Sequence, residues 1–263
     1  VVMTRQPRKR KQNFESSFKS RKGNQMFKKW FGKLSKGNTL YYPGCVTRYA
    51  LPEVQERYER LLRQAKVDFI VLPGELQCCG SPVRRAGYHQ DFERLKTKNM
   101  ETFARFSVTK IITNCPGCYH TLKYEYQMDV VHTTQVLSEK NAGNPSKSDL
   151  NQNQPLTYHD PCHLGRWSGI YDEPRHLLHQ AGWQVVELPD NREMSLCCGA
   201  GGGVKSNYPD LANSIAQARL AQVENGRLCT SCPLCYAHFK ENAGDIQVME
   251  FSEALTQASE ARR

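Results

Sequence analysis

The sequence lacks long hydrophobic runs and has almost no acidic residues near its start. None of its 263 residues lies in an apolar run approaching the roughly 18 residues that a spanning helix needs, so no membrane span is expected. No stretch has the pattern of a secretory signal. Residues 1–38 contain twelve Lys or Arg and one acid, Glu15, and carry a charge of +11, whereas the whole chain carries +10. The remaining 225 residues sum to −1, which argues against a basic nucleic-acid-binding domain.

The basic stretch predicts a disordered tail that ends in a short amphipathic helix. Up to about Gln25 it is rich in Lys, Arg, Ser and Asn, a composition that buries no core. Within residues 26–34, four apolar residues recur at helical spacing: Phe27, Trp30, Phe31 and Leu34. Three roles are open for this segment, namely contact with an anionic membrane surface, docking to a partner protein, or loose packing as a solvated leader.

Beyond the tail, the sequence contains an internal repeat built on cysteine. The tripeptide Cys-Cys-Gly occurs at 78–80 and again at 197–199, an offset of 119 residues. Two further pairs of segments match with their cysteines offset by 117 residues: LYYPGC (40–45) with LTYHDPC (156–162), and NCPGCY (114–119) with SCPLCY (231–236). The repeat therefore predicts a duplicated domain.

Each repeat has the cysteine pattern C-x(n)-CC-x(m)-CxxC. The spacings n and m are 32 and 35 in the first repeat, and 34 and 33 in the second. Ten of the eleven cysteines fit this pattern. Only Cys229 is left over, and its place inside an expected strand predicts a buried apolar thiol.

Strand-like and helix-like segments alternate through both repeats. Expected strands lie near 39–43, 67–72, 110–114, 155–159, 183–188 and 226–230, each shortly before a cysteine group. Expected helices lie near 51–66, 88–106, 171–181 and 208–224, and each repeat closes with a further strand and helix, at 130–139 and 246–257. This alternation indicates parallel strands joined by crossover helices. Because ligands bind beyond the carboxyl ends of such strands, the cysteine groups of each repeat are expected to converge.

The sequence thus predicts an α/β fold with two tandem, duplicated cysteine-rich domains and parallel sheets. The first domain is expected at 39–140 and the second at 156–263. The polar, turn-rich segment 141–155 is the expected linker between them, and residues 1–38 are the tail.

Five thiols at one sheet edge favour a metal site over disulfides. Disulfides belong mainly to small secreted proteins, and five cysteines cannot pair completely. Zinc needs four ligands, which a CxxC motif and two further thiols can supply, and a cubane iron–sulfur cluster also needs four. Adjacent cysteines direct their side chains apart, which suits a larger or opened cluster in which neighbouring thiols bind different irons. The residue pattern by itself leaves zinc and iron–sulfur clusters open.

These motifs resemble the CCG-domain family, the cysteine-rich domain of the B and D subunits of heterodisulfide reductase and of related iron–sulfur oxidoreductases. The resemblance covers about residues 39–250. The first repeat meets the family's cysteine spacing, and the second has a slightly shorter second spacing. The phrases YHDPCHLGR (158–166) and CCGAGGGV (197–204) are similar to the branch that contains the D subunits.

The resemblance implies that each set of five cysteines holds a non-cubane 4Fe-4S cluster, with zinc as the alternative in one site. The ligands would be Cys45, Cys78, Cys79, Cys115 and Cys118 for the first cluster, and Cys162, Cys197, Cys198, Cys232 and Cys235 for the second. The implied function is that of an oxidoreductase subunit that passes electrons through two clusters to a disulfide held between the domains. One alternative is an electron-transfer subunit of a glycolate or lactate oxidation complex without its own substrate chemistry. The other is a zinc-stabilised scaffold.

Partners and proton donors are also implied. Residues 1–38 lack the CxxCxxC motifs of the ferredoxin-like portion of the D subunits, so either electrons come from a ferredoxin-like or flavoprotein subunit, or the chain is a fragment. A small thiol or disulfide would be the substrate, and no nucleic acid is expected. His159 and His163 flank Cys162 and are candidates for relaying a proton to a leaving thiolate, with a structural role equally open. Thiolate-bound clusters favour a reducing cytoplasm, with peripheral membrane contact through residues 26–34 or a partner.

Overall fold

The computed structural model describes residues 37–140 and 154–260, with side chains up to residue 256. The expected tail, the amphipathic helix expected within 26–34 and most of the expected linker lie outside the described residues. In the two described ranges, no helix is both long and apolar enough to cross a bilayer.

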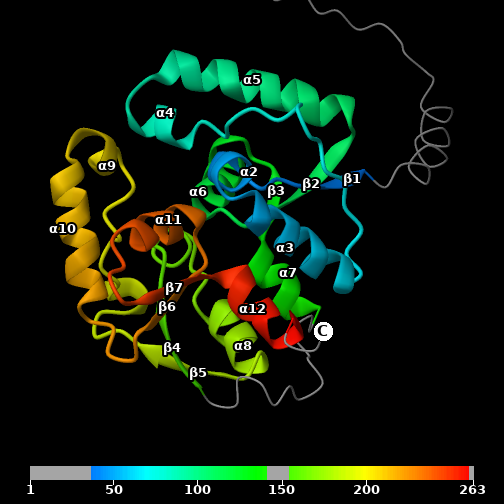
Figure 1. The fold of residues 1–263 in the computed structure, drawn as a ribbon. Helices are drawn as coiled ribbons and strands as arrows, with labels where there is room; N and C mark the ends of the chain where they lie inside the picture. The colour runs from blue at the N-terminus through cyan, green and yellow to red at the C-terminus, as the bar shows by residue number, and fades with distance from the viewer. Residues whose placement is uncertain (1–36, 141–153, 261–263) are drawn as a thin grey trace, which may run out of the picture. The chain divides into compact units, whose positions relative to one another are not determined.

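The first half of the described chain is built on a parallel sheet with the strand order β1-β2-β3 (Figure 1). Its strands are β1 (Asn38–Tyr41), β2 (Val108–Thr113) and β3 (Asp129–His132). Its helices are α2 (Cys45–Ala50), α3 (Pro52–Gln64), α4 (Ser81–Arg85), α5 (His89–Arg105), α6 (Pro116–His120) and α7 (Thr133–Glu139), with a π-helical turn η1 (Thr121–Glu125). The two long helices predicted from the sequence are confirmed as α3 and α5.

The second half is built on a parallel sheet with the strand order β5-β4-β6-β7. Its strands are β4 (Gln154–His159), β5 (Trp183–Glu187), β6 (Arg227–Thr230) and β7 (Gln247–Glu250). Its helices are α8 (Asp172–Gln180), α9 (Val204–Asn207), α10 (Pro209–Leu220), α11 (Pro233–Glu241) and α12 (Phe251–Glu260), with a 3-10 turn η3 (Arg192–Met194). The predicted α/β fold with parallel sheets in both halves is confirmed.

One expected strand, residues 67–72, is reduced to a single bridge beside β1. Ile70 forms an isolated parallel bridge with Leu40. The Ile70 backbone N–H donates to the Thr39 carbonyl at 2.8 Å and its carbonyl accepts from the Tyr41 N–H at 2.9 Å, and the pairing with β1 does not extend beyond this residue. The segment lies beside β1 as β5 lies beside β4, so the two halves have the same strand order once it is included.

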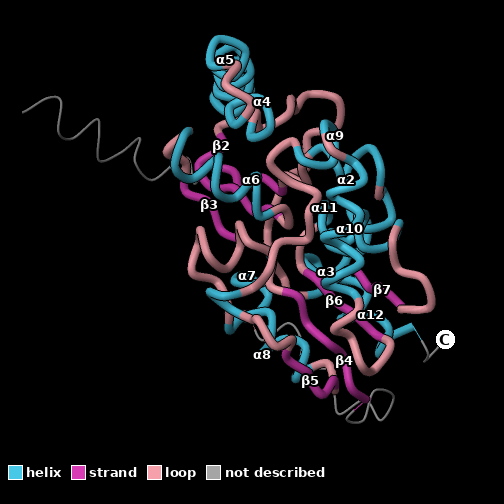
Figure 2. Tube along the Cα trace, turned by 90° about the vertical axis from the view of Figure 1, so that its left-hand side faces the viewer, coloured by secondary structure: helices cyan, strands magenta, loops and turns pink. Residues whose placement is uncertain are grey.

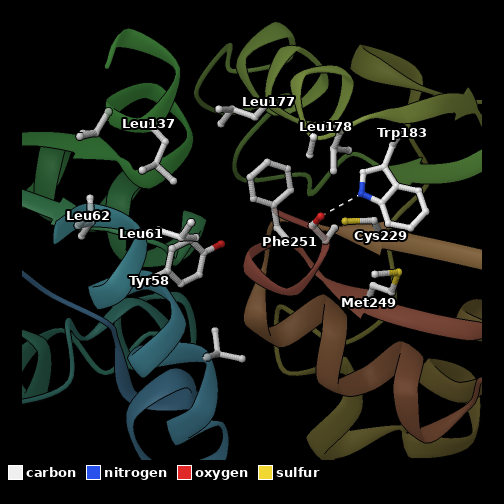
Figure 3. Close-up of a cluster of buried hydrophobic side chains, with 14 of the residues drawn as sticks. Tyr58, Leu61, Leu62, Leu137, Leu177, Leu178, Trp183, Cys229, Met249 and Phe251 are labelled. Atoms are coloured by element: carbon white, nitrogen blue, oxygen red, sulfur yellow. Dashed lines mark hydrogen bonds between the residues drawn. The ribbon is translucent and has the colours of Figure 1, made fainter. Parts of the chain in front are cut away.

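A hydrophobic core shared by the two halves holds them together. Helices α3 and α7 of the first half contact α12 and α8 of the second half, respectively. The buried side chains in Figure 3 come from both halves: Tyr58, Leu61, Leu62 and Leu137 from the first, and Leu177, Leu178, Trp183, Cys229, Met249 and Phe251 from the second. Cys229 is fully buried in this core, which confirms the prediction of a buried thiol.

Each half has a further hydrophobic cluster of its own, and the cysteine groups lie in these clusters. Successive side chains of a strand point to opposite faces of the sheet. Tyr41 of β1 therefore joins the shared core, while its neighbour Tyr42 joins the first half's own cluster together with Cys79 and Cys118. The second half's own cluster contains three cysteines: Cys198, Cys232 and Cys235.

A buried carboxyl group links the two halves within the shared core. Glu250, at the end of β7, accepts hydrogen bonds from the Tyr58 hydroxyl at 3.0 Å and from the Ser252 backbone N–H at 2.6 Å. Burial raises the pKa of Glu250 from 4.5 to about 7. In the unfolded chain the group ionises near its ordinary value, so ionisation disfavours the folded protein as the pH rises from the lower value to the higher one.

The substitution Glu250→Gln is expected to flatten the pH dependence of stability. Glutamine keeps polar partners for Tyr58 and Ser252 but cannot ionise, so the variant avoids a penalty of about 3 kcal/mol that the parent incurs above about pH 7. This pH dependence is measured as thermal unfolding midpoints at about pH 5 and about pH 8. Relative to the parent, the variant is expected to have a higher midpoint at the higher pH than at the lower one. The control is Glu241→Gln, an exposed carboxylate paired with Lys205, which should change neither value. Parallel pH profiles for parent and E250Q would contradict the assignment.

Candidate metal centres

The five cysteines singled out in the first half come together at the carboxyl ends of the strands. Cys45 opens α2 directly after β1, and Cys115 precedes α6 directly after β2. Sulfur–sulfur hydrogen bonds join the five thiols in one series: Cys45 donates to Cys78, Cys79 also donates to Cys78, and Cys118 donates both to Cys79 and to Cys115. The sulfur atoms of Cys79 and Cys118 are 3.3 Å apart.

The second half repeats this arrangement in the same order. Cys162 donates to Cys197, Cys198 also donates to Cys197, and Cys235 donates both to Cys198 and to Cys232. The structure therefore gathers the ten cysteines predicted from the repeat into two groups of five. All eleven cysteines of the chain are free thiols.

One thiol of each group is strongly acidified. A hydrogen bond from Cys45 lowers the pKa of Cys78 to about 3, and the Gly80 backbone N–H, 3.4 Å from the Cys78 sulfur, favours the thiolate further. In the second group, a hydrogen bond from Cys162 lowers the pKa of Cys197 to about 2, and a backbone N–H again lies 3.4 Å from the sulfur. The first cysteine of the adjacent pair is thus strongly acidified in both halves. In the first half, a hydrogen bond from Cys118 lowers the pKa of Cys115 as well.

A glycine beside the first group leaves room for the sulfur atoms. Gly44 has a φ of +78°, in the left-handed region that side chains avoid. A Cβ atom at this position would lie 3.0 Å from the Cys118 sulfur and 3.3 Å from Cβ of Cys115. The close approach of the backbone to the thiols therefore depends on glycine.

In the first half, three buried side chains hold the backbone of the adjacent cysteine pair. The Tyr42 hydroxyl donates to the carbonyl of residue 77 at 2.5 Å, and the Asn99 amide donates to that of residue 78 at 3.0 Å. The Tyr126 hydroxyl donates to the carbonyl of residue 79 at 3.1 Å. Three consecutive carbonyls are thus fixed, which sets the direction of both thiols.

In the second half, a buried ion pair has the corresponding role. Arg175 makes two hydrogen bonds of 2.8 Å to the carboxylate of Asp160, which also accepts from the Arg192 backbone N–H at 2.8 Å. The carbonyl oxygen of Asp160 accepts from the Ser195 hydroxyl at 3.1 Å. The loop leading to Cys197 is thereby tied to the end of β4.

The two candidate histidines occupy different positions. The Nδ1 atom of His163 lies 3.3 Å from the Cys162 sulfur, and its ring stacks on Trp167 with centroids 5.2 Å apart and an interplanar angle of 16°. Burial, followed by the charge of Arg85, lowers the pKa of His163 to about 4. His159 is only 1% exposed, and burial lowers its pKa to about 3. The structure thus places both rings near the second group, His163 at its edge and His159 in the interior.

Rings and charges of both halves meet next to the second cysteine group. The His120 ring lies 5.1 Å from that of Trp167 and 6.4 Å from that of His163. The Arg85 guanidinium lies 4.3 Å from the centre of the Trp167 ring. Helix α2, which begins at Cys45, contacts α11 of the second half, and the two lie side by side in Figures 1 and 2. The two cysteine groups therefore flank one boundary between the halves.

The residues that surround and hold these two cysteine groups were not predicted from the sequence. Asn99 and Tyr126 lie far from any cysteine in the sequence, and only the fold brings them to the adjacent pair. His120 follows Cys118 by two residues, and Trp167 follows Cys162 by five, so their closeness to the motifs was a usable signal.

The donor set fits a polynuclear iron–sulfide group. In the described ranges, no group of three or more His, Cys, Asp or Glu side chains is arranged to hold a single metal ion. Each cysteine group offers sulfur donors alone, together with a backbone N–H directed at one of the sulfur atoms. These are features by which proteins hold iron–sulfur clusters and tune them.

The fold and the two cysteine groups define a duplicated α/β protein with a five-thiol site in each half. A family model described as a cysteine-rich domain, CCG, matches residues 39–123 and 156–240, and the chain belongs to this family. The resemblance noted in the sequence is therefore confirmed.

The chain is similar to curated proteins that are named as different oxidoreductases. The chain is 31% identical over 242 residues to the D subunit of dihydromethanophenazine:CoB–CoM heterodisulfide reductase from Methanosarcina acetivorans, covering 85% of this chain and 59% of the relative. It is 34% identical over 244 residues to EtfAB:quinone oxidoreductase of Syntrophomonas wolfei, and the match covers 84% of this chain and 34% of that relative. It is 33% identical over 232 residues to the B subunit of fumarate reductase (CoM/CoB) from Methanothermobacter marburgensis, and the match covers 83% of this chain and 46% of that relative. The chain thus spans between a third and three fifths of the length of these relatives.

The substitution Asp160→Asn is expected to destabilise the second half by about 3 kcal/mol, because it leaves the buried Arg175 guanidinium with one charged partner fewer. The side chains of this pair are 3% and 8% exposed. Asp172→Asn is the matched control, since Asp172 pairs with Arg192 at the surface, where the loss should stay below about 1 kcal/mol. Urea unfolding midpoints of the two variants measure the difference. Equal losses would show that the buried pair does not hold the loop.

Proposed function

We propose that the protein is an iron–sulfur oxidoreductase subunit that reduces a disulfide, with one cluster held by each group of five cysteines. The observation that carries this proposal is the identical order of thiol contacts in the two halves, next to a common boundary. Relatives named as iron–sulfur proteins and as heterodisulfide reductase support it. When bound, such clusters supply one-electron carriers whose potential the protein tunes.

The fifth thiol of each group supports an opened rather than a cubane cluster. A cubane uses four thiolates, whereas each half presents five sulfur donors in one contiguous set. Hydrogen bonds hold the carbonyls of residues 77–79 in the first half, which fixes the backbone that carries the adjacent pair, and both sulfur atoms belong to the same series of thiol contacts. Both members of the pair are therefore assigned as ligands.

Disulfide reduction requires two electrons and two protons, which break the sulfur–sulfur bond and leave two thiols. Of the two histidines, His163 is the better placed to relay a proton, because its Nδ1 atom is at the edge of the second group and its ring is only partly buried. Because burial lowers its pKa to about 4, the ring is neutral near pH 7 and would hold the proton only during transfer. Trp167 fixes the plane of this ring by stacking on it. His159 lies in the interior, where exchange of protons with solvent is slow.

A small pocket adjoins the first group. It is lined by Tyr42, Gly44, Cys45, Arg48, Tyr49 and Cys78, among others. Arg48 supplies a positive charge beside these sulfur atoms, which favours an anionic thiol or disulfide there.

The electrons are proposed to come from a ferredoxin-like or flavoprotein partner, since relatives are named as subunits of larger enzymes. A second candidate function is electron transfer without substrate chemistry, as a subunit of a larger oxidation complex. It is favoured by the similarity to a relative named EtfAB:quinone oxidoreductase. The two functions share the same clusters and differ in whether a thiol binds at them.

Cluster assignment is tested with two cysteine variants purified without oxygen. Cys198→Ser removes a proposed ligand of the second group and is expected to lower iron and acid-labile sulfide to about half of the parent content. Cys229→Ala removes the eleventh cysteine, which lies in the shared core, and is expected to keep the full content. Zinc in place of iron in the parent protein, or equal iron loss in both variants, would contradict the assignment.

Substrate chemistry is tested by adding a thiol to the oxidised protein and recording electron paramagnetic resonance spectra. A disulfide-reducing subunit is expected to give a new signal with coenzyme M or coenzyme B, because the product thiol binds at the site where the disulfide is cleaved. The S-methylated form of coenzyme M has no free thiol and is the control. Reversible reduction of the clusters with no thiol-dependent signal would favour the electron-transfer function instead.

A further inference from the structure

Corresponding positions of the two halves carry different residues beside the cysteine groups. At the offset of 117 residues that relates the repeats, Tyr42 corresponds to His159. Both follow a strand residue, Tyr41 or Tyr158, whose side chain points into the shared core. Because strand side chains alternate, both side chains point to the opposite face, where the cysteines of their half lie.

The neighbours of Tyr42 show which groups lie beside this position in the first half. It belongs to the first half's own cluster, together with Cys79 and Cys118, and it interacts electrostatically with these two cysteines and with Cys78. Its hydroxyl, however, donates to the carbonyl of residue 77 at 2.5 Å. The only donor that this side chain has is therefore committed to the backbone.

His159 occupies the corresponding position but has no such commitment. The charged groups that it interacts with are Arg219, Asp160 and Cys197, and the Phe239 ring of α11 meets it edge-on at 4.8 Å with an interplanar angle of 85°. The residue is 1% exposed, and neither ring nitrogen has a hydrogen-bond partner in the described parts of the chain. Leaving a buried polar group without a partner costs about 1–3 kcal/mol. A histidine in this position therefore indicates a partner that the polypeptide itself does not provide.

We propose that a ring N–H of His159 donates a hydrogen bond to sulfur of the cluster bound by the second cysteine group, on the side of Cys197. This inference rests on the proposed function, because it requires a cluster in that group. Every tautomer of the ring has at least one N–H, so a donor is always present. A hydrogen bond to sulfur stabilises the more negatively charged, reduced cluster and raises its reduction potential. His159 is thus a tuning residue of the second cluster, with no counterpart in the first.

The test is a redox titration of the anaerobically purified protein and of His159→Phe. Phenylalanine keeps a ring against Phe239 and removes both nitrogens. We expect one of the two cluster components to shift to a lower potential in this variant and the other to stay unchanged. His159→Gln restores an N–H donor and should return most of the shift. Tyr42→Phe removes the hydroxyl at the corresponding position of the first half and should leave the component that responds to His159 where it is.

A second readout detects the contact directly. In protein labelled with ¹⁵N-histidine, pulsed electron paramagnetic resonance of the reduced component should show a nitrogen coupling that disappears in His159→Phe. Iron and sulfide contents distinguish a failure of this inference from a failure of the proposed function. Loaded protein with unchanged potentials and unchanged coupling in His159→Phe would overturn the inference and leave the proposed function intact. Protein that binds no cluster in the second group would overturn both.

Discussion

Five thiols in contact with one another cannot all ionise, because like charges at such short range repel. The structure reflects this constraint in both halves. Cys78 and Cys197 have strongly lowered pKa values, whereas hydrogen bonds to these neighbours and burial raise the pKa of Cys45 and of Cys162. A site that brings so many sulfur donors together is stable in its fully ionised form only when positive charge lies among them. Iron within an iron–sulfur cluster supplies that charge, and the remaining features of the fold serve to hold the donors in place.

The two faces of each sheet have different roles in holding the cysteines in place. One face joins the shared hydrophobic core, where Trp183, Phe251 and Cys229 pack against side chains of the first half. The other face belongs to each half's own cluster and carries the cysteines. Because the shared core fixes the two sheets to each other, the two cysteine groups flank a single boundary instead of moving independently. Such an arrangement suits chemistry that delivers two electrons to one substrate.

The two halves use different means to hold the same thiol order. The first half fixes the adjacent pair with neutral donors, Tyr42, Asn99 and Tyr126. The second half uses the ion pair of Asp160 and Arg175, and His159 takes the place of the tyrosine. The cysteine order is therefore common to both halves, whereas the residues around the cysteines differ.

Much of this could be predicted from the sequence, for physical reasons that also explain the gaps. Cysteine spacing and strand–helix alternation predicted two parallel α/β halves and ten gathered cysteines, because the carboxyl ends of parallel strands converge. The expected strand at 67–72 was wrong in extent, since only Ile70 of this segment pairs with β1. Asn99 and the pair of Asp160 with Arg175 could not be found in this way, because their partners are set by tertiary contacts that leave no local pattern.

The central claim is that each group of five cysteines binds its own iron–sulfur cluster. Anomalous diffraction at the iron and zinc absorption edges, from crystals grown without oxygen, tests it most directly. The account predicts two separate iron sites, one at each group of five cysteines, with inorganic sulfide between the metal and the protein. A single tetrahedral zinc in either group, or iron bound elsewhere, would contradict it.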